Sequence, residues 1–356
     1  MTGISPFSRR LGLAMDILRA NLVDRAFPYK LTFAVTDRCN ARCALCGIWN
    51  KSTQSSELAT DEIISFLTRN AHFSWIDLTG GELTERPDAL EIVQAVIRHQ
   101  HRLFHLHIPT NGLDLPGITT LVRTVLALSP PLFTLTISLD GPPALHDRLR
   151  GRPGTWEACL RLYAALRPLC HAGFRIFFGY TLSHLNAGAF PATVRAAQER
   201  LPGLAIQDFH LNLAHSSAHY YDNTRREWPP FPREQYLQDL TWFRQHRPAR
   251  FLDPVSVLEN RFLRLAPIFL DQGKNPVPCQ ALASSVFLGP SGTVYPCTIW
   301  NRPLGEIRNH DYHLAPILAA CRSVRTAIQT GECPQCWSPC EAYPSLLAQG
   351  FLYNGR

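Results

Sequence analysis

The 356-residue sequence lacks a hydrophobic run long enough to cross a membrane, which would need about 18 consecutive apolar residues. It also lacks a convincing export signal. Ser8-Arg9-Arg10-Leu11 resembles the start of a twin-arginine signal, but Asp16, Arg19 and Asp24 interrupt the apolar stretch that should follow. No internal repeat and no low-complexity tract is found. These absences predict a cytoplasmic protein with a packed core and no membrane partner.

An excess of charge of one sign is also missing. Thirty-five Lys and Arg residues stand against 28 Asp and Glu, so the net charge of +7 is modest for this length, and the basic residues, almost all arginine, are scattered. Binding to nucleic acid, which favours a basic stripe, is therefore not expected. A solvated basic surface is the simplest interpretation, although an anionic substrate or an acidic redox partner would also suit it.

Cysteine, by contrast, is abundant. Eleven Cys residues in a chain without an export signal fit a reducing compartment, where thiols at short spacings indicate metal binding and not disulfides. The densest group is the C-x3-C-x2-C loop of Cys39, Cys43 and Cys46, directly after the strand-like run 31–36. Thiolates select iron–sulfur clusters, zinc or copper(I). A [4Fe–4S] cluster takes four Cys ligands, so three would leave one iron open for chemistry. A zinc knuckle or three buried structural thiols are the alternatives.

Strand-like and helical patterns alternate from residue 31 to about 213. The expected strands are short runs rich in β-branched and aromatic residues, at 31–36, 75–79, 103–108, 133–139, 174–181 and 205–213. The helical patterns between them lie near 61–70, 88–101, 117–128, 155–171 and 189–200. Six βα units in a row imply an α/β fold with parallel strands and right-handed crossovers. Periodicity alone does not choose between an open sheet and a barrel.

Three further segments complete the domain plan around the α/β region, which we place at 31–221. Residues 1–30 contain an amphipathic helix, expected to pack across the body of the protein. Residues 222–272 show two helical patterns and are interpreted as a helical bridge. Residues 273–356 are rich in Pro and Cys and predict a small metal-stapled domain, because they lack the apolar periodicity of an independent core.

The C-terminal segment carries five thiols, which are Cys279, Cys297, Cys333, Cys336 and Cys340. A hairpin over 286–297, with Pro-Ser-Gly at its turn, would deliver the second of them. Two distant thiols plus a C-x2-C pair make a complete four-thiolate site, which suits either zinc or an iron–sulfur cluster. Cys159, Cys170 and Cys321 have no partner at ligand spacing and are expected to be buried small residues.

Polar residues follow the expected strands, where ligands of parallel sheets and barrels bind. The second strand ends in Gly80-Gly81-Glu82, whose glycines let the backbone approach a ligand and whose carboxylate could receive an ammonium group. Segments of this kind also occur as ordinary turns. The polar and glycine residues at the strand ends include Gly80, Gly81, Glu82, Asn111, Ser138, Thr181 and Asn186.

A dense run of His, Tyr and Asn over 210–223 follows the sixth strand. At the mouth of a barrel it would suit substrate recognition by hydrogen bonds and proton donation, with His210, His215 and Tyr220 as the candidates. The alternation of polar and apolar residues at its start suits a half-buried strand equally well.

The three-thiol loop and the motifs after it resemble the radical SAM superfamily. Thr110-Asn-Gly112 and Ser138-Leu-Asp-Gly141, followed by His146-Asp147 and an Arg-Gly pair, match segments of that family in order. The resemblance implies a partial (β/α)6 TIM-type barrel. It also implies a catalytic [4Fe–4S] cluster on Cys39, Cys43 and Cys46, whose open iron chelates S-adenosylmethionine. An electron from a flavodoxin- or ferredoxin-type donor would then generate a 5′-deoxyadenosyl radical.

The same resemblance implies roles for residues at the strand ends. In the family, the Gly-Gly-Glu segment holds the methionine amino group, which assigns Glu82. A Ser and an Arg contact the ribose or carboxylate of the cofactor, for which we choose Ser138 and Arg148. The family often has an aromatic residue just before the third Cys, whereas this chain has Leu45, which can still pack on a purine.

The C-terminal segment resembles the twitch and SPASM extensions of radical SAM enzymes, which bind auxiliary [4Fe–4S] clusters. The full SPASM pattern has seven Cys and two clusters, so five thiols imply one auxiliary cluster, as in twitch members. Its expected ligands are Cys279, Cys297, Cys333 and Cys336, with Cys340 able to replace one of the last pair. A structural zinc is the alternative.

The expected function is therefore abstraction of a hydrogen atom from a C–H bond of a small natural-product or sugar-like intermediate, leading to oxidation, epimerisation or another radical modification. No leader-binding domain is expected before residue 31, which favours a small molecule over a ribosomally made peptide, although a separate leader-binding protein could supply that part. A peptide maturase is the alternative. A zinc- or iron–sulfur-stapled binding or electron-transfer protein would not explain the three-thiol loop and Gly-Gly-Glu at successive strand ends.

Overall fold

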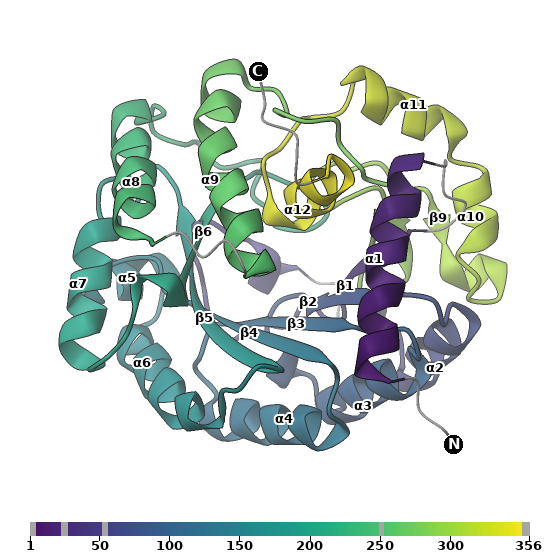
Figure 1. Ribbon diagram of the computed structural model, residues 1–356, viewed down its shortest axis with the longest axis horizontal. Helices are drawn as coiled ribbons and strands as arrows, with labels where there is room; N and C mark the ends of the chain where they lie inside the picture. Colours follow the sequence, from purple (N-terminus) through teal and green to yellow (C-terminus); the bar gives the residue numbers. More distant parts are fainter. Residues whose placement is uncertain (1–4, 23–27, 52–55, 249–252, 351–356) are drawn as a thin grey trace.

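A curved parallel sheet surrounded by helices forms the centre of the computed structural model, which describes residues 5–22, 28–51, 56–248 and 253–350 (Figure 1). The parallel strands are β1 (Lys30–Ala34), β2 (Trp75–Thr79), β3 (His105–Thr110), β4 (Leu132–Ser138), β5 (Phe174–Leu182) and β6 (Phe209–Leu213). They pair in the order β6-β5-β4-β3-β2-β1. The (β/α)6 partial barrel expected from the sequence is confirmed.

Helices on the outer side of this sheet connect successive strands. They are α2 (Thr60–Arg69), α3 (Ala89–His99), α4 (Leu115–Leu128), α5 (Pro143–Arg150), α6 (Thr155–Leu166) and α7 (Phe190–Arg200). The sequence analysis missed α5, because the Pro-Pro pair at its start was not recognised as the beginning of a helix. It also began the sixth strand too early, because Ile206–Asp208 form a 3₁₀ turn in which the Asp208 carboxylate accepts a hydrogen bond from Ala205 N at 2.9 Å.

The inner side of the sheet is polar, unlike the packed interior of a closed barrel. Residues at alternate positions of a strand share one face, and here these positions hold charged, hydroxyl and imidazole groups. The inward residues of β1 to β4 include Lys30, Thr32, Asp77, His105, His107, Thr134 and Thr136. They surround a cavity instead of filling it.

A buried ion pair joins the first two strands inside the barrel. Lys30 Nζ lies 2.9 Å from Asp77 Oδ2, and both side chains are almost completely buried. Burial raises the pKa of the Asp77 carboxyl, but Lys30 and His107 together outweigh it and hold that pKa well below its usual range. His107 Nδ1 lies 3.3 Å from Asp77 Oδ1. The charges therefore stabilise one another where water is scarce.

The C-terminal segment continues the same sheet. β7 (Ser285–Leu288) pairs in parallel with β1, and β8 (Thr293–Tyr295) and β9 (Gly305–Glu306) follow in antiparallel order, so the described sheet has nine strands. The expected hairpin is confirmed, with its turn between β7 and β8. The remaining helices are α8 (Arg233–His246), α9 (Pro254–Gln272), α10 (Ala315–Ala319), α11 (Arg322–Thr330) and α12 (Pro339–Ala348). In Figure 1, α8, α9 and α12 lie above the sheet.

The N-terminal helix α1 (Pro6–Leu22) crosses one face of the molecule and contacts α12. The residue that attaches this helix to the rest of the protein is the buried Asp16, which accepts hydrogen bonds from Arg102 Nη2 at 2.9 and 3.0 Å.

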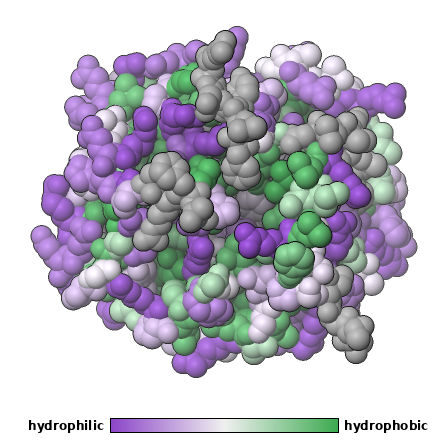
Figure 2. Space-filling view, viewed as in Figure 1, coloured by the Kyte–Doolittle hydropathy of each residue, from purple (hydrophilic) through white to green (hydrophobic). Residues whose placement is uncertain are grey.

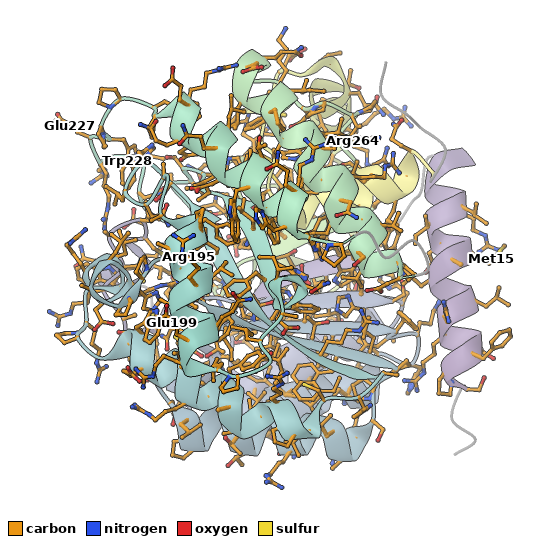
Figure 3. The ribbon with its side chains drawn as sticks, turned by 60° about the vertical axis from the view of Figure 1, so that its left-hand side comes forward. Met15, Arg195, Glu199, Glu227, Trp228 and Arg264 are labelled. Atoms are coloured by element: carbon orange, nitrogen blue, oxygen red, sulfur yellow. The ribbon has the colours of Figure 1, made fainter. Side chains whose placement is uncertain are left out.

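Four large apolar side chains of α1 are exposed, namely Phe7, Leu11, Met15 and Leu18. Hydrophobic residues gather where this helix crosses the surface in Figure 2, and Figure 3 shows α1 at the edge of the molecule with Met15 labelled. Residues 1–4 and 23–27 of the predicted N-terminal segment lie outside the described residues.

Among the described residues, no helix is both long enough and apolar enough to cross a membrane.

The anchor of α1 leads to a first testable prediction. Arg102→Ala is expected to lower the free energy of unfolding by about 1–3 kcal/mol, because it removes the charged partner of a buried carboxylate. It should also accelerate limited proteolysis within α1. The matched control is Arg98→Ala, which removes an exposed arginine of α3. Equal proteolysis of the two variants would show that the contact between Arg102 and Asp16 does not hold the helix.

Candidate active site

One large cavity, of about 1990 Å³, occupies the inside of the partial barrel. It runs along the whole length of the strands, since its lining includes Phe104, Pro131 and Ala172, which precede β3, β4 and β5, as well as residues at their far ends. Most of the site residues expected from the sequence line it. They are Cys39, Cys43, Cys46, Gly80, Gly81, Glu82, Asn111, Ser138, Thr181, His210, His215 and Tyr220.

The loop that carries the three thiols is held by the end of β2. Gly81 N donates to Thr36 O, and Glu82 N donates to Arg38 O, each at 2.8 Å. A Cβ atom on Gly81 would lie 2.0 Å from Arg38 O, so no larger residue fits there. The two glycines were expected to let the backbone approach a ligand. They line the cavity, but their tightest approach is to the backbone of the thiol loop.

The end of α5 holds the middle of the same loop. Arg42 N donates to Arg150 O at 3.0 Å, and Ala44 N donates to Leu149 O at 2.7 Å. Gly151 ends the helix with φ +64°, and a Cβ atom on it would lie 2.2 Å from Arg42 O. The glycine therefore serves both as a helix cap and as the point of closest contact.

A segment after β6 holds the far end of the loop. Gly47 N donates to Tyr221 O at 2.7 Å, Asn223 Nδ2 donates to Leu45 O at 2.9 Å, and Arg226 Nη2 donates to Cys46 O at 3.1 Å. The sequence analysis considered the run 210–223 only for substrate contact or as a strand. Its last residues instead support the thiol loop.

The thiols themselves are suited to a positively charged metal group. Burial raises the pKa of Cys39 to about 11 and that of Cys46 to about 12, so a bound metal would be needed to keep them as thiolates. Arg150 Nη1 lies 3.7 Å from Cys43 Sγ. Within the described residues, no three Cys, His, Asp or Glu side chains stand close enough together to hold a metal ion as they are. The fit of an iron–sulfur cluster therefore rests on the thiol donors and the adjoining cavity.

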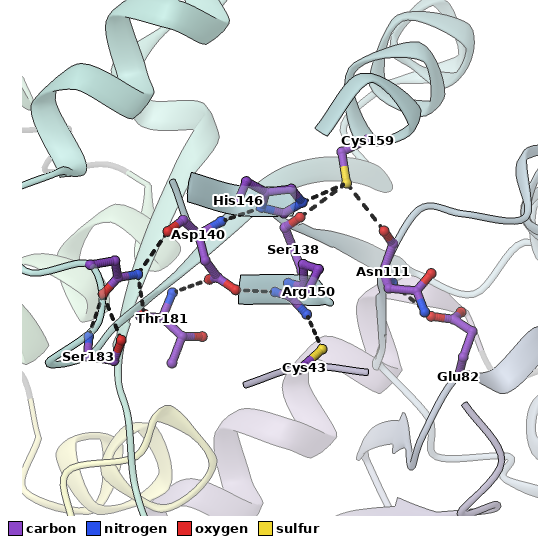
Figure 4. A network of polar contacts seen from close by, with 11 residues as sticks. Cys43, Glu82, Asn111, Ser138, Asp140, His146, Arg150, Cys159, Thr181 and Ser183 are labelled. Atoms are coloured by element: carbon purple, nitrogen blue, oxygen red, sulfur yellow. Dashed lines mark hydrogen bonds and ion pairs between the residues drawn. The ribbon is translucent and has the colours of Figure 1, made fainter. Parts of the chain in front are cut away.

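A polar network connects the thiol loop to the ends of β4 and β5 (Figure 4). Arg150 Nη2 lies 2.5 Å from Asp140 Oδ2, and Asp140 Oδ1 accepts a hydrogen bond from Thr181 N at 2.8 Å. Cys159 joins the network from α6, where its thiol lies 3.2 Å from both Asn111 O and Ser138 O. This cysteine is buried, as expected, and it also bridges two strand ends.

Two of the expected cofactor-binding residues do not line the cavity. Arg148 is exposed on α5, and the arginine of that helix that lines the cavity is Arg150. The spacing His-Asp-x-x-Arg-Gly places its arginine at position 150, so the correct signal was present in the sequence. Asn186 is buried, and its side chain donates to Asp140 O at 2.9 Å and accepts from Ser183 N at 2.7 Å. It positions the strand ends and does not face a ligand.

Glu82 is the buried carboxyl group of the site. Its oxygens accept hydrogen bonds from Thr110 Oγ1 at 2.9 Å and from Asn111 N at 2.7 Å. Burial outweighs these bonds and raises the pKa of Glu82 to about 7. An ammonium group in the cavity would restore the carboxylate, which agrees with the role that the family resemblance implies.

The three candidate catalytic residues also line the cavity. Burial lowers the pKa values of His210 and His215 to about 4, so both imidazoles are neutral near pH 7. Neither Nε2 atom has a hydrogen-bond partner among the described residues. Tyr220 Oη lies 2.8 Å from Thr79 Oγ1. These groups can bind a polar substrate, and the neutral imidazoles can donate or accept hydrogen bonds.

The sequence analysis missed the polar inner face of the barrel. The alternation Trp75-Ile-Asp77 and His105-Leu-His107 was visible, but in a parallel strand buried on both sides it does not show which face is inward. The structure places Lys30, Asp77 and His107 in contact with one another and with the cavity.

The five C-terminal thiols fall into two groups. Four of them line one small cavity of about 20 Å³, namely Cys279, Cys297, Cys333 and Cys336. Cys340 lines the large cavity instead. A volume of 20 Å³ holds about one or two water-sized spheres, and among the described residues these thiols do not stand close enough together to hold a metal ion as they are.

Comparisons with known proteins agree with this site. The model of the radical SAM superfamily matches residues 33–195. Mycofactocin maturase MftC of Mycobacterium tuberculosis is 34% identical over 151 residues, which are 41% of this chain and 36% of the relative. The antilisterial bacteriocin subtilosin biosynthesis protein AlbA of Bacillus subtilis is 24% identical over 80% of this chain and 58% of its own length. The chain thus spans between about a third and three fifths of these relatives.

A solved structure shares the fold. Streptococcus suis SuiB, in its crystal structure bound to the precursor peptide SuiA, is 14% identical and matches with a TM-score of 0.51 over 88% of this chain and 70% of SuiB. At this identity the match supports the architecture alone.

The buried carboxyl group gives a second testable prediction, for the metal-free protein. Glu82→Gln should gain stability over the wild type as pH rises from about 4.5 to about 7, because in that range only the unfolded wild type releases the proton. Below this range Glu82 carries its proton in both the folded and the unfolded wild type, so it gives the stability no pH dependence. Above this range the advantage of the variant is constant, on the order of 2–3 kcal/mol. Urea unfolding at pH 5 and pH 8 measures the change.

The control is Glu91→Gln, which alters an exposed carboxylate of α3. The amide keeps fewer acceptors than the carboxylate, but that loss adds a constant and leaves the pH dependence untouched. A stability difference that does not vary with pH would contradict the raised pKa of Glu82.

Proposed function

The chain belongs to the radical SAM superfamily, and from this premise we propose that it is a maturase that modifies a peptide inside the barrel cavity. The observation that carries the proposal is the cavity itself. The cavity is about 1990 Å³ and extends along the full length of the strands, so it offers room for an extended substrate beside the cluster and S-adenosylmethionine. Relatives named as a maturase and as a bacteriocin biosynthesis protein, and a neighbour solved with a precursor peptide, point the same way.

The proposed cofactors are a [4Fe–4S] cluster and S-adenosylmethionine. Cys39, Cys43 and Cys46 would hold the cluster. When both are bound, the cluster and the cofactor would supply a 5′-deoxyadenosyl radical. The electron that this requires would come from a flavodoxin- or ferredoxin-type donor. Glu82 would bind the methionine ammonium group, and the hydroxyl groups of Ser138 and Thr181, which line the same cavity, would contact the rest of the cofactor.

Polar atoms that lack partners support an amide-rich substrate. Thr32 Oγ1, His210 Nε2 and His215 Nε2 all lie on residues that line the cavity, and none has a hydrogen-bond partner among the described residues. A peptide backbone offers a donor and an acceptor at every residue. A small natural-product or sugar-like substrate, expected from the sequence, could also satisfy these atoms.

We further propose one auxiliary [4Fe–4S] cluster on Cys279, Cys297, Cys333 and Cys336, in a twitch-like or SPASM-like arrangement. The shared small cavity supports this ligand set. Gln335 Nε2 lies 3.2 Å from Cys333 Sγ, and Trp300 N lies 3.3 Å from Cys297 Sγ, so two of the sulfur atoms already have hydrogen-bond donors beside them. Such donors stabilise negative charge on sulfur and tune a cluster.

The ligand sets are tested by metal content, which is the third prediction. After anaerobic reconstitution, the Cys39/Cys43/Cys46→Ala variant and the Cys333/Cys336→Ala variant should each keep about half of the wild-type iron, because each loses one of two four-iron sites. Cys170→Ala, at an exposed thiol, is the control and should keep all of it. If the Cys39/Cys43/Cys46→Ala variant contains zinc instead of iron, the C-terminal thiols hold a structural zinc ion and not an auxiliary cluster.

The substrate class is tested by turnover, which is the fourth prediction. The reconstituted protein is incubated with dithionite, S-adenosylmethionine and either a mixture of synthetic peptides or a mixture of sugars and cyclitols. A peptide should increase 5′-deoxyadenosine and change mass, and the Cys39/Cys43/Cys46→Ala variant should do neither. An increase with the sugar mixture alone would reverse the choice of substrate, and no 5′-deoxyadenosine under any condition would refute the radical chemistry.

A further inference from the structure

The segment 217–223, which follows β6, lies between two groups of thiols. On one side it supports the thiol loop, since Asn223 Nδ2 donates to Leu45 O at 2.9 Å. On the other side His219 Nε2 donates to Cys297 O at 3.0 Å. Cys297 is one of the four thiols around the small cavity, which we call the auxiliary thiols. One short segment therefore contacts both proposed metal sites.

His219 is the residue at which the two sides meet. Its imidazole stacks on Tyr295, two residues before Cys297, with the ring centroids 4.1 Å apart. A carbonyl oxygen can only accept, so the Nε2 atom that faces Cys297 O carries the ring proton. The main-chain oxygen of His219 accepts from Lys51 Nζ at 2.6 Å, and this ammonium group lies 3.3 Å from Asp37 Oδ1. Because Asp37 precedes the thiol loop and Lys51 follows it, His219 is tied to both ends of that loop.

Hydrogen bonds within the segment make it stiff. Asn223 Oδ1 accepts from Ser217 N at 2.9 Å. Ser217 Oγ accepts from Tyr220 N at 3.1 Å and lies 3.3 Å from His219 Nδ1. Tyr220 Oη lies 2.8 Å from Thr79 Oγ1, at the end of β2. A segment closed by so many bonds of its own passes a displacement of His219 on to the thiol loop.

The auxiliary thiols give a reason for such a displacement. Among the residues that the structure describes, they do not stand close enough together to hold a metal ion. Metal binding must therefore draw them together. The hairpin that carries Cys297 also presents Tyr295 and Cys297 O to His219, so a shift of this wall acts directly on the imidazole.

We propose that His219 is a positioning residue that couples the auxiliary thiols to the thiol loop. The inference rests on the proposed function, which assigns a cluster and S-adenosylmethionine to the thiol loop and a metal group to the auxiliary thiols. Metal binding at the auxiliary thiols fixes His219, the segment 217–223 then fixes the thiol loop, and S-adenosylmethionine binds there more tightly. Coupling of this kind is reciprocal, so the cofactor strengthens metal binding at the auxiliary thiols by the same factor.

Binding of S-adenosylmethionine tests the coupling without turnover. Anaerobically reconstituted wild type and the Cys333/Cys336→Ala variant, matched for iron in the thiol loop, are compared by equilibrium dialysis with labelled cofactor, each with and without His219→Phe. The phenylalanine keeps the stack on Tyr295 and removes the hydrogen bond. Emptying the auxiliary thiols should weaken binding by about 5-fold or more, the lower end of the usual range for coupled sites, and should have no effect beside His219→Phe.

The matched control is His246→Phe. His246 also stacks on a ring and has a carbonyl partner, both of them on Trp242, and it lines neither cavity. This variant should leave the 5-fold difference as it is. A difference that persists beside His219→Phe, or that is absent without it, would overturn the coupling. Failure of the wild type to bind iron or S-adenosylmethionine would instead refute the proposed function.

Hydrogen exchange of the metal-free protein tests the same bridge and decides the question even if reconstitution fails. His219→Phe should accelerate amide exchange both in residues 39–51 and in residues 293–300, because each side loses a support. His219→Gln, whose side-chain amide can donate to Cys297 O, should restore the wild-type rates in residues 39–51, and His246→Phe should change neither region. Acceleration confined to one region, or found in neither, would show that His219 does not connect them.

Discussion

The close approach of backbone to backbone around the thiol loop is the constraint on which the rest of the site depends. Gly81, Gly151 and Gly47 each bring a different segment so near to its neighbour that a single Cβ atom would collide with a carbonyl oxygen, at 2.0, 2.2 and 2.3 Å. Main-chain hydrogen bonds accompany each contact. The loop thus takes its shape from segments far apart in the sequence, and a metal group could add to that shape but does not have to create it.

The electrostatics of the cavity follow a second constraint, which is the burial of its charged groups. Most buried charges of the cavity described here lie beside a charge of opposite sign. Asp140 is paired with Arg150, and Asp77 is paired with Lys30. Glu82 has only hydrogen-bond donors and is accordingly a poor acid. A buried carboxyl group such as Glu82 destabilises the folded protein when it is ionised without a positively charged partner. Proteins tolerate this at sites where a bound ligand supplies the positive charge.

Much of this architecture could be predicted from local pattern. β2 was placed correctly to the residue, because a short β-branched and aromatic run ends in Gly-Gly. Motif order located the catalytic thiols and Glu82 in one cavity. The choice of Arg148 over Arg150 was an avoidable error, since the spacing alone decided it.

Other features depend on contacts that no local pattern encodes. The polar inner face of the barrel was missed because a strand buried on both sides does not reveal which side encloses space. The separation of Cys340 from the other thiols is visible only after folding, which brings its carbonyl oxygen to Lys30, a residue distant in sequence. The domain plan also treated residues 273–356 as a separate module, whereas β7 lies against β1.

That strand pairing has a consequence for how the chain is made. β1 is an inner strand of the finished sheet, yet one of its edges is covered only when β7, which is distant in sequence, has left the ribosome. Until then the unpaired backbone of β1 is a template for wrong partners. Closing so long a loop is also slow. The loop of Cys39, Cys43 and Cys46 directly follows this strand, so its final position also waits for the pairing of β1 with β7.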